Sequence, residues 1–444
     1  MRFPNAETIG PAFHSVEFPE FARISYEPDH PEIDDIDAAT RAALDDLPFD
    51  LPEGASIAVG VGSRGIHDIA DVAQTTISYL QEHNFDPFVI PAMGSHGGAT
   101  PDGQIAVFEG LGIDEDRLGC RIDPRMETEI IGTATVNGTN FDVQFATSAL
   151  EADAVLPINR IKAHTSFIGH IESGINKMLV VGFGKQPGAH TMHELAVEMG
   201  FVPVIESAVE VILEEVSVVG GIGIIENFYD HTSQIEGIPV DNLPDGERPL
   251  LEIANRQLGT LPFDDIDILI VDEIGKDISG TGMDTNVVGR YYALTAPEPE
   301  RPNIKRIYVR NLTEATHGNG HGIGLADFTR QSVIDQIDLD QVYMNAMTGA
   351  APKKARLPVV LPHDELALTA AASSVGAYNP ETSKIVWMKN TLELSSLYVS
   401  TALLDDLPPQ ATVRSNARLM FDDDGEMHFD DIDQPMSTTA PSGM

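Results

Sequence analysis

Short runs rich in valine and isoleucine recur along the chain, and each run ends in a glycine-rich or polar loop. The runs lie at 56–65, 87–98, 153–165 and 267–282. Runs of this length are typical of strands that are buried on both faces of a parallel sheet. Because such sheets bind ligands at the carboxyl ends of their strands, we expect the functional residues in the loops that follow these runs.

The segments between the runs carry helical patterns. After the first run, apolar residues recur at helical spacing and define one face, namely Ile66, Ile69, Ala70, Ala73, Ile77 and Leu80. After the second run, Thr100, Pro101 and Asp102 predict an N-cap, a first-turn proline and an acid at the start of a helix that ends near Gly110. The alternation predicts an α/β protein with two α/β domains, largely parallel sheets and a ligand cleft between the domains.

A turn-rich, polar stretch at 235–265 marks the expected change of domain. We assign the first domain to 1–262, the second to 263–420, and an acidic, partly disordered tail to 421–444. The second domain includes 303–313, the helix-like segment 328–337, and 356–362.

The chain of 444 residues is strongly acidic, with Lys+Arg 27 against Asp+Glu 69 and a formal net charge of −42. The acids are spread along the chain rather than gathered in one tail. Such self-repulsion is tolerated best where concentrated salt screens it to within about 3 Å. We therefore interpret the charge as an adaptation to a salt-rich cytoplasm. It makes nucleic acids and anionic membranes unfavourable partners.

One cysteine, Cys120, excludes an internal disulfide and a cysteine-based metal cage within one chain. The N-terminus lacks the pattern of a signal peptide, and no run of roughly 18 apolar residues occurs. The simplest expectation is a soluble, cytoplasmic protein.

The loop after the first run matches the dinucleotide fingerprint G-x-G-x-x-G through Gly60, Gly62 and Gly65. The acid expected about 20 residues later has no clear counterpart. Arg64, in the same loop, offers a planar two-pronged donor for a carboxylate or a phosphate. A tight turn without any ligand fits the pattern equally well.

The loop after the second run, 94–100, places His96 between glycines. Glycines let the backbone approach a ligand, the start of a helix favours an anion, and an imidazole can move a proton near neutral pH. The alternative is that His96 only hydrogen-bonds a turn.

The segment 159–193 carries four histidines and three lysines in a chain with few cations, so an anionic or metallic ligand is expected there. The zinc-hydrolase pattern H-E-x-x-H is absent. Lys177 leads into an apolar run, where a poorly solvated ammonium can act as a nucleophile, or can pair with Glu172. His190 and His193 are spaced for one helical face, although such pairs are often surface histidines.

Two further polar, glycine-rich loops lie at 272–290 and 317–327. Their polar side chains could close over a ligand from the second domain: Lys276, Asp284, Asn286, Arg290 and His317.

Taken together, these motifs resemble the lactate racemase family, whose members use a nickel-pincer nucleotide. The resemblance covers roughly 55–235 and continues more loosely into 272–284. It implies a two-domain α/β isomerase that racemises or epimerises a 2-hydroxy acid. It also implies a pyridinium-derived nucleotide that is tethered through a lysine and carries nickel between sulfur and carbon donors, with one protein histidine completing the coordination. Enzymes that synthesise this cofactor would be partners.

Carried over residue by residue, the resemblance makes Lys177 the tethering lysine and His193 the nickel ligand, with His190 as the fallback. It places the cofactor and the acid/base residues in the first domain. The glycine-rich loop after the second run would contact the cofactor through Gly94, Ser95, Gly97 and Gly98.

The same resemblance makes His96 and His164 the paired acid/base residues, with Arg64 and Lys276 as substrate-binding cations. This set is chemically coherent. Racemisation by hydride removal needs a base on each face for the hydroxyl proton, a hydride acceptor between them, and a cation for the carboxylate.

Two features depart from the family. The interval between His164 and Lys177 is a few residues longer, and the substrate-lining pattern of the C-terminal part is not recognisable. We therefore expect a different 2-hydroxy acid, larger or more acidic than lactate. The alternatives are a nicotinamide-dependent hydroxyacid oxidoreductase and a non-catalytic protein that binds a nucleotide or a metal.

Overall fold

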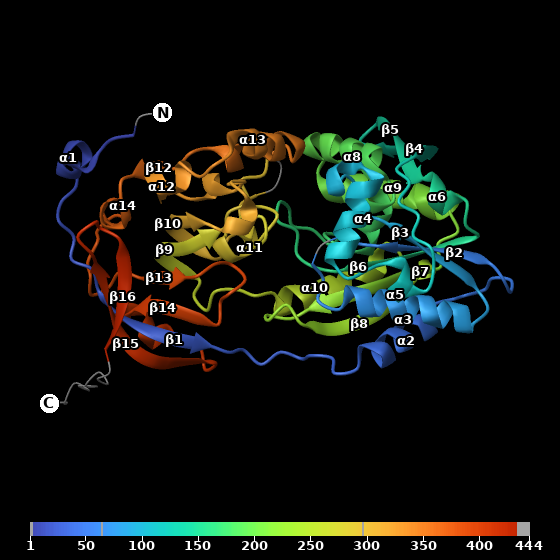
Figure 1. Cartoon of the computed structure of the whole chain (residues 1–444), viewed down its shortest axis with the longest axis horizontal. Helices are drawn as coiled ribbons and strands as arrows, with labels where there is room; N and C mark the ends of the chain where they lie inside the picture. Colours follow the sequence, from blue (N-terminus) through green and yellow to red (C-terminus); the bar gives the residue numbers. More distant parts are fainter. Residues whose placement is uncertain (1–2, 64, 295–296, 433–444) are drawn as a thin grey trace. The chain divides into compact units, whose positions relative to one another are not determined.

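The computed structural model describes residues 3–63, 65–294 and 297–432 (Figure 1). Its internal contacts divide the chain into two compact units. One unit is His30–Leu258, and the other combines the described residues of 1–29 and of 259–444. The change of unit after Leu258 falls within the stretch 235–265, where the sequence predicts a boundary.

The unit His30–Leu258 contains a five-stranded sheet in the order β3-β2-β6-β7-β8. Its first four strands are parallel to their neighbours and β8 is antiparallel, while β4 and β5 form a separate hairpin. The strands are β2 Ser56–Val61, β3 Asp86–Pro91, β4 Thr128–Val136, β5 Thr139–Ala146, β6 Ala154–Arg160, β7 Gly220–Glu226 and β8 Thr232–Pro239.

Helices cover both faces of this sheet. The longer ones are α2 Ile36–Asp45, α3 Ile69–Glu82, α4 Pro101–Gly110, α8 Lys185–Met199, α9 Phe201–Glu215 and α10 Arg248–Gln257. The short ones are α5 Glu115–Leu118, α6 Thr147–Leu150, α7 Ile175–Lys177 and the π-helical turn η3 Met178–Gly182.

The two faces of the sheet differ in residue size. On one face, branched side chains such as Val59 and Ile222 pack with α2, α3 and α4 in one buried core. On the other face, Gly60 and Gly221 lie against Phe183 and Ile175 of the segment that follows β6. Small residues on this second face let α7 and η3 approach the sheet closely.

The sequence predicted this unit well. All three strand runs in it are strands, and the expected helical face is buried in α3. Thr100 caps α4, since its Oγ accepts a hydrogen bond of 3.1 Å from the Gly103 amide, and Pro101 opens the helix.

The other unit contains a nine-stranded sheet in the order β12-β11-β10-β9-β13-β14-β1-β15-β16. The strands from β12 to β13 are parallel, and the rest are antiparallel. They are β1 Glu20–Tyr26, β9 Asp265–Ile274, β10 Asn303–Leu312, β11 Phe328–Arg330, β12 Val359–Leu361, β13 Ile385–Met388, β14 Ser396–Ser400, β15 Ala411–Phe421 and β16 Met427–Ile432. Its helices are α1 Ala6–Ile9, α11 Thr285–Val288, α12 Gln331–Ile334, α13 Leu339–Thr348 and α14 Asp364–Ala372.

Three features of this unit differ from the expectations. β1 pairs with β14 and β15, so the start of the chain belongs here and not with 30–262, because Phe21 and Ile24 bury their side chains in this sheet. The segment 328–337 begins as β11, because Phe328 and Thr329 pair with β10, and only a single helical turn follows.

The third difference concerns the acidic tail, which forms β16 over Met427–Ile432. Met427 is buried, and Phe429 stacks on Tyr398 with ring centroids 4.1 Å apart, so a few apolar residues are enough to order this part. The expected partial disorder of the tail is not tested over 433–444, which lie outside the described residues. Across the described ranges, no helix is long and apolar enough to cross a membrane.

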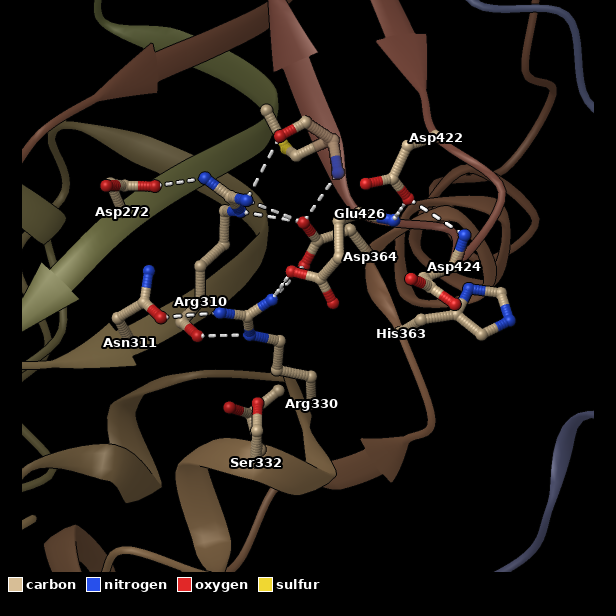
Figure 2. Close-up of polar contacts among 12 residues, drawn as sticks. Asp272, Arg310, Asn311, Arg330, Ser332, His363, Asp364, Asp422, Asp424 and Glu426 are labelled. Atoms are coloured by element: carbon tan, nitrogen blue, oxygen red, sulfur yellow. Dashed lines mark hydrogen bonds and ion pairs between the residues drawn. The ribbon is translucent and has the colours of Figure 1, made fainter.

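A buried ion network fastens the β15–β16 hairpin to the parallel strands (Figure 2). Asp364, which is 0% exposed, accepts hydrogen bonds from Arg310 Nη2 at 2.6 Å, from the Met427 amide at 2.8 Å and from the Tyr308 hydroxyl. Arg330 pairs with Glu426 and lies 3.6 Å from Asp364. Every charge in the network is matched, so we interpret it as structural.

Replacing Asp364 with alanine should lower the free energy of unfolding by about 3–5 kcal/mol, because it leaves the buried guanidinium of Arg310 without its main partner. Chemical denaturation of the full chain in concentrated salt measures the change. Asp406→Ala removes an exposed partner of Lys384 and should cost no more than about 1 kcal/mol. Equal losses in the two variants would contradict the network's role.

Candidate functional site

The carboxyl ends of β2, β3 and β6 lie side by side at one edge of the five-stranded sheet (Figure 1). The loops that leave them are 62–68, 92–100 and 161–174, and the last continues into α7, η3 and α8. Most of the residues singled out from the sequence lie in these loops.

Protein side chains fill the space beside the first two glycines of the apparent dinucleotide fingerprint. A Cβ on Gly60 would lie 2.1 Å from Phe183 Cζ, and one on Gly62 would lie 2.7 Å from Asn159 Oδ1. In a dinucleotide-binding protein the second of these glycines leaves space for a pyrophosphate. Here the glycines instead allow η3 and its flanks to pack on β2, which disfavours the nicotinamide alternative. Arg64 lies outside the described residues.

His96 is exposed in the loop after β3, and its Nδ1 lies 2.5 Å from Ser63 Oγ in the loop after β2. The Gly94 amide in turn donates to the Gly182 carbonyl of η3 at 3.3 Å. The loops of β2 and β3 are therefore linked to each other and to the segment that carries Lys177. Ser95 and Gly97 are partly buried beside them, and Gly98 is exposed.

A buried lysine stabilises this loop through hydrogen bonds. Lys185 is 0% exposed, and its Nζ donates to the Pro91 carbonyl at 2.9 Å and to Gln104 Oε1 at 3.4 Å. Gln104 Nε2 donates to the carbonyls of Gly94 at 3.1 Å and of His96 at 3.4 Å. Burial lowers the pKa of Lys185 from 10.5 to about 8.

His164 follows β6 in a loop that is organised by a buried acid. Glu172 accepts hydrogen bonds from the amides of His164 at 2.5 Å and Gly169 at 3.2 Å. Burial raises the pKa of Glu172, while these amides and the charge of Lys177 oppose the rise. The Ser166 amide donates to His164 Nδ1 at 3.1 Å and helps to fix the ring.

An aromatic cluster joins His164 to α8 and α9. Phe167 and Phe201 stack at 4.4 Å with nearly parallel planes, and His164 lies 4.3 Å from Phe167 and 5.8 Å from Phe201. His193 contacts Phe201 edge-on at 6.0 Å. The two histidines, which are assigned to proton transfer and to the metal, therefore contact the same ring.

His193 has the protonation state that a metal ligand needs. Its Nδ1 donates to the Ala189 carbonyl at 2.6 Å, so the lone pair of the neutral ring is on Nε2. Burial, followed by the charge of Lys177, lowers the pKa of His193 and favours the neutral form. His190 is 80% exposed in its side chain and lies 3.8 Å from Glu194, so the structure offers no comparable geometry there.

Lys177 ends α7 and leads directly into the π-helical turn η3. Such turns are rare and are frequent at functional sites. The turn before Lys177 is anchored by Glu247, which accepts hydrogen bonds from the Asn176 amide at 2.9 Å and its Nδ2 at 2.6 Å. Burial raises the pKa of Glu247 to about 7.

Lys276 belongs to the other unit, after β9. Its Nζ donates to the Gly280 carbonyl at 2.6 Å and its amide donates to Thr316 Oγ1 at 3.0 Å. The charge of Lys276 also disfavours protonation of two buried basic groups, Lys354 and His321. Burial lowers the pKa of Lys354 to about 8 and that of His321 to about 4.

Arg290, another residue of these loops, binds Asp327 and the Leu325 carbonyl and is structural.

The structure thus places His164 and His193 against the same ring, Phe201, and Lys177 near enough to affect the pKa of His193. The loop of His96 is linked to η3 through Gly94. The sequence alone predicts no role for Phe201, Lys185 or Glu247. Lys185 was visible as a cation beside the apolar run, but its burial depends on tertiary packing. No local sequence pattern indicates a role for Phe201 or Glu247, because the residues that they contact are distant in sequence.

A shallow hollow of about 270 Å³ lies on the loop 161–174, lined by Gly169, His170, Arg248, Leu251, Glu252 and Asn255. His170, the remaining histidine of the segment, pairs with Glu206 at 2.7 Å. The hollow includes none of the assigned residues. Within the described residues, no group of three or more His, Cys, Asp or Glu side chains is arranged to hold a metal ion.

No protein-family model and no curated protein matches the sequence. Among solved structures, the chain is similar to the lactate racemase apoprotein from Thermoanaerobacterium thermosaccharolyticum. The two chains are 12% identical, the match covers 84% of this chain and 89% of that chain, and the TM-score is 0.43. This likeness is too distant to support an argument about function. The support for a function comes from the residues of this chain.

The lowered pKa of Lys185 predicts a pH-dependent stability. The unfolded chain binds this proton up to about pH 10.5, whereas the folded chain releases it near pH 8. The unfolded state holds more protons within this window, so the Lys185 contribution to the free energy of unfolding should rise with pH, by up to about 3 kcal/mol.

Denaturation of the wild type and of Lys185→Met, from pH 7 to 10.5 in concentrated salt, tests this. The free energy of the wild type minus that of the variant should increase through the window. A difference that stays constant with pH would contradict burial of the ammonium.

Proposed function

We propose that the protein is a racemase or epimerase of a 2-hydroxy acid and acts with a nickel-pincer nucleotide that is tethered to Lys177. One observation carries the proposal. His164 and His193 contact the same ring, Phe201, and Lys177 lies close enough to lower the pKa of His193. The resemblance to the lactate racemase family assigns proton transfer, metal binding and tethering to His164, His193 and Lys177. These residues come from three different elements.

The residues present fit such a cofactor. The site offers one neutral imidazole with an available Nε2, and no complete protein metal site exists among the described residues. This donor set suits a metal whose other ligands come from the bound nucleotide, because borderline metals accept imidazole beside sulfur. When bound, the nucleotide would supply the hydride acceptor.

The protein side chains would then bind, orient and exchange protons. His164 and His96 would take up and return the hydroxyl proton, one for each face of the substrate carbon. Glu172 would orient His164 through the loop backbone, and Lys185 and Gln104 would support the loop of His96.

The loop residues Gly94, Ser95, Gly97 and Gly98 remain proposed cofactor contacts. Arg64 and Lys276 remain proposed partners of the substrate carboxylate. Enzymes that synthesise and insert the cofactor would be the protein's partners.

A non-catalytic binding protein is the second candidate. Its support is the geometry of His193, whose Nε2 lone pair could bind a metal whether or not turnover follows. It differs from the first candidate in one measurable respect, since it would leave an enantiopure 2-hydroxy acid unchanged.

Coexpression with cofactor-synthesis enzymes, followed by intact mass and metal analysis, tests the proposal. We expect a mass increment on Lys177 and roughly one nickel per chain. Lys177→Ala should abolish the increment, because no amine remains for attachment. His96→Ala and His164→Ala should keep the increment and lower racemisation by about 10²–10⁴, the usual cost of losing a general base.

His190→Ala is the matched control, because this exposed histidine lies in the same helix as His193 and should be dispensable. An active protein with an unmodified Lys177 would exclude the tether. Full turnover in either His96→Ala or His164→Ala would exclude the two-base assignment.

A further inference from the structure

Phe201 occupies a distinctive position in the cluster. It is the first residue of α9, directly after Gly200, whose φ of +82° allows the sharp junction between α8 and α9. Its ring stacks on Phe167 at 4.4 Å and lies 5.8 Å from His164 and 6.0 Å from His193. It therefore borders both the proposed base and the proposed metal ligand.

Phe201 is also the ring that a ligand can reach. Phe167 is only 5% exposed, whereas Phe201 is partly exposed. The neighbouring acid, Glu172, is 2% exposed and has both oxygens engaged with backbone amides. Ile168, on the same loop, is 58% exposed. The accessible surface beside His164 therefore includes the ring of Phe201 and the side chain of Ile168, next to the partly exposed Thr165 and Ser166.

This surface restricts the substrate. A polar or charged side chain placed against the face of Phe201 would lose hydration there that the phenyl ring cannot replace with a hydrogen bond. An aromatic side chain would bury apolar area and could stack on the ring or meet it edge-on. The discrimination should be large, since a single methylene in an apolar pocket is worth about 10–200-fold.

We infer that Phe201 determines substrate specificity and that the protein acts on 2-hydroxy acids with a large apolar side chain, preferably an aromatic one. This inference rests on the proposed function and specifies its substrate class. It meets the expectation of an acid larger than lactate and opposes that of a more acidic one.

The test compares kcat/KM for 3-phenyllactate, lactate and malate in the cofactor-loaded full chain. The wild type should prefer 3-phenyllactate by roughly tenfold or more. Phe201→Leu should lower kcat/KM for 3-phenyllactate by about tenfold, chiefly through KM, and change that for lactate by less than about threefold. Phe201→Tyr keeps the ring and should retain the preference.

Phe49→Leu is the matched control. Phe49 is a partly buried ring that contacts Tyr79 and Phe85, and it precedes β2 at the opposite end of the sheet. It should lose similar packing and leave the substrate preference unchanged. If Phe201→Leu lowers the activity toward all three acids equally, or if the wild type prefers malate or lactate, the inference is overturned. Loss of the Lys177 mass increment in Phe201→Leu would also overturn it, because the ring would then serve the cofactor.

Calorimetric titration of the same proteins with 3-phenyllactate separates this inference from the proposed function. Binding that weakens about tenfold in Phe201→Leu, with no racemisation of any acid by the wild type, would refute the racemase and support the ligand class. Racemisation with unaltered binding in Phe201→Leu would support the racemase and refute the role of Phe201.

Discussion

The site depends on one packing contact, that of Phe183 against the bare backbone of Gly60. Any side chain at this position of β2 would overlap the ring, since a Cβ would lie 2.1 Å from it. The contact lets η3 lie directly on the strand ends, and Lys177 and α8 follow from the path of η3. The hydrogen bond between Gly94 and Gly182 then links the loop of His96 to the same turn. Three candidate residues, His96, Lys177 and His193, are therefore positioned by one close approach of a helix to a sheet.

Burial, rather than the net charge of −42, sets the protonation of this region. Lys185 and His193 both have lowered pKa values, and in both the first cause is desolvation. A strongly negative protein would raise the pKa of such cations if long-range attraction by its acids were dominant. Concentrated salt screens exposed charges within a few ångströms but screens buried groups much less. An acidic surface is therefore compatible with a neutral imidazole at the candidate metal position.

The sequence predicted the elements whose signals are local. Thr100 caps its helix as expected, and the strand runs are strands, because capping and apolar patterns act within a few residues. It failed where partners are distant in sequence. β1 joins a sheet made almost entirely from the end of the chain, and the role of Phe201 depends on rings in two other elements. The fingerprint at Gly60 and Gly62 shows the same limit, since a local pattern cannot tell whether a phosphate or Phe183 fills the space.

The two units use buried polar groups in opposite ways. In one unit such groups stabilise the fold, and in the other they form the candidate site. Asp364 is surrounded by donors and matched by Arg310, so its network has no capacity left for a ligand and serves to fix a hairpin. His193 donates through one nitrogen and keeps the other lone pair available. Glu172 uses both oxygens to accept hydrogen bonds from backbone amides, and it orients the loop of the candidate base His164. A buried polar group is thus a candidate for chemistry only where one of its hydrogen-bonding atoms stays available to a ligand. In the five-stranded unit, Nε2 of His193, beside Phe201, meets this condition.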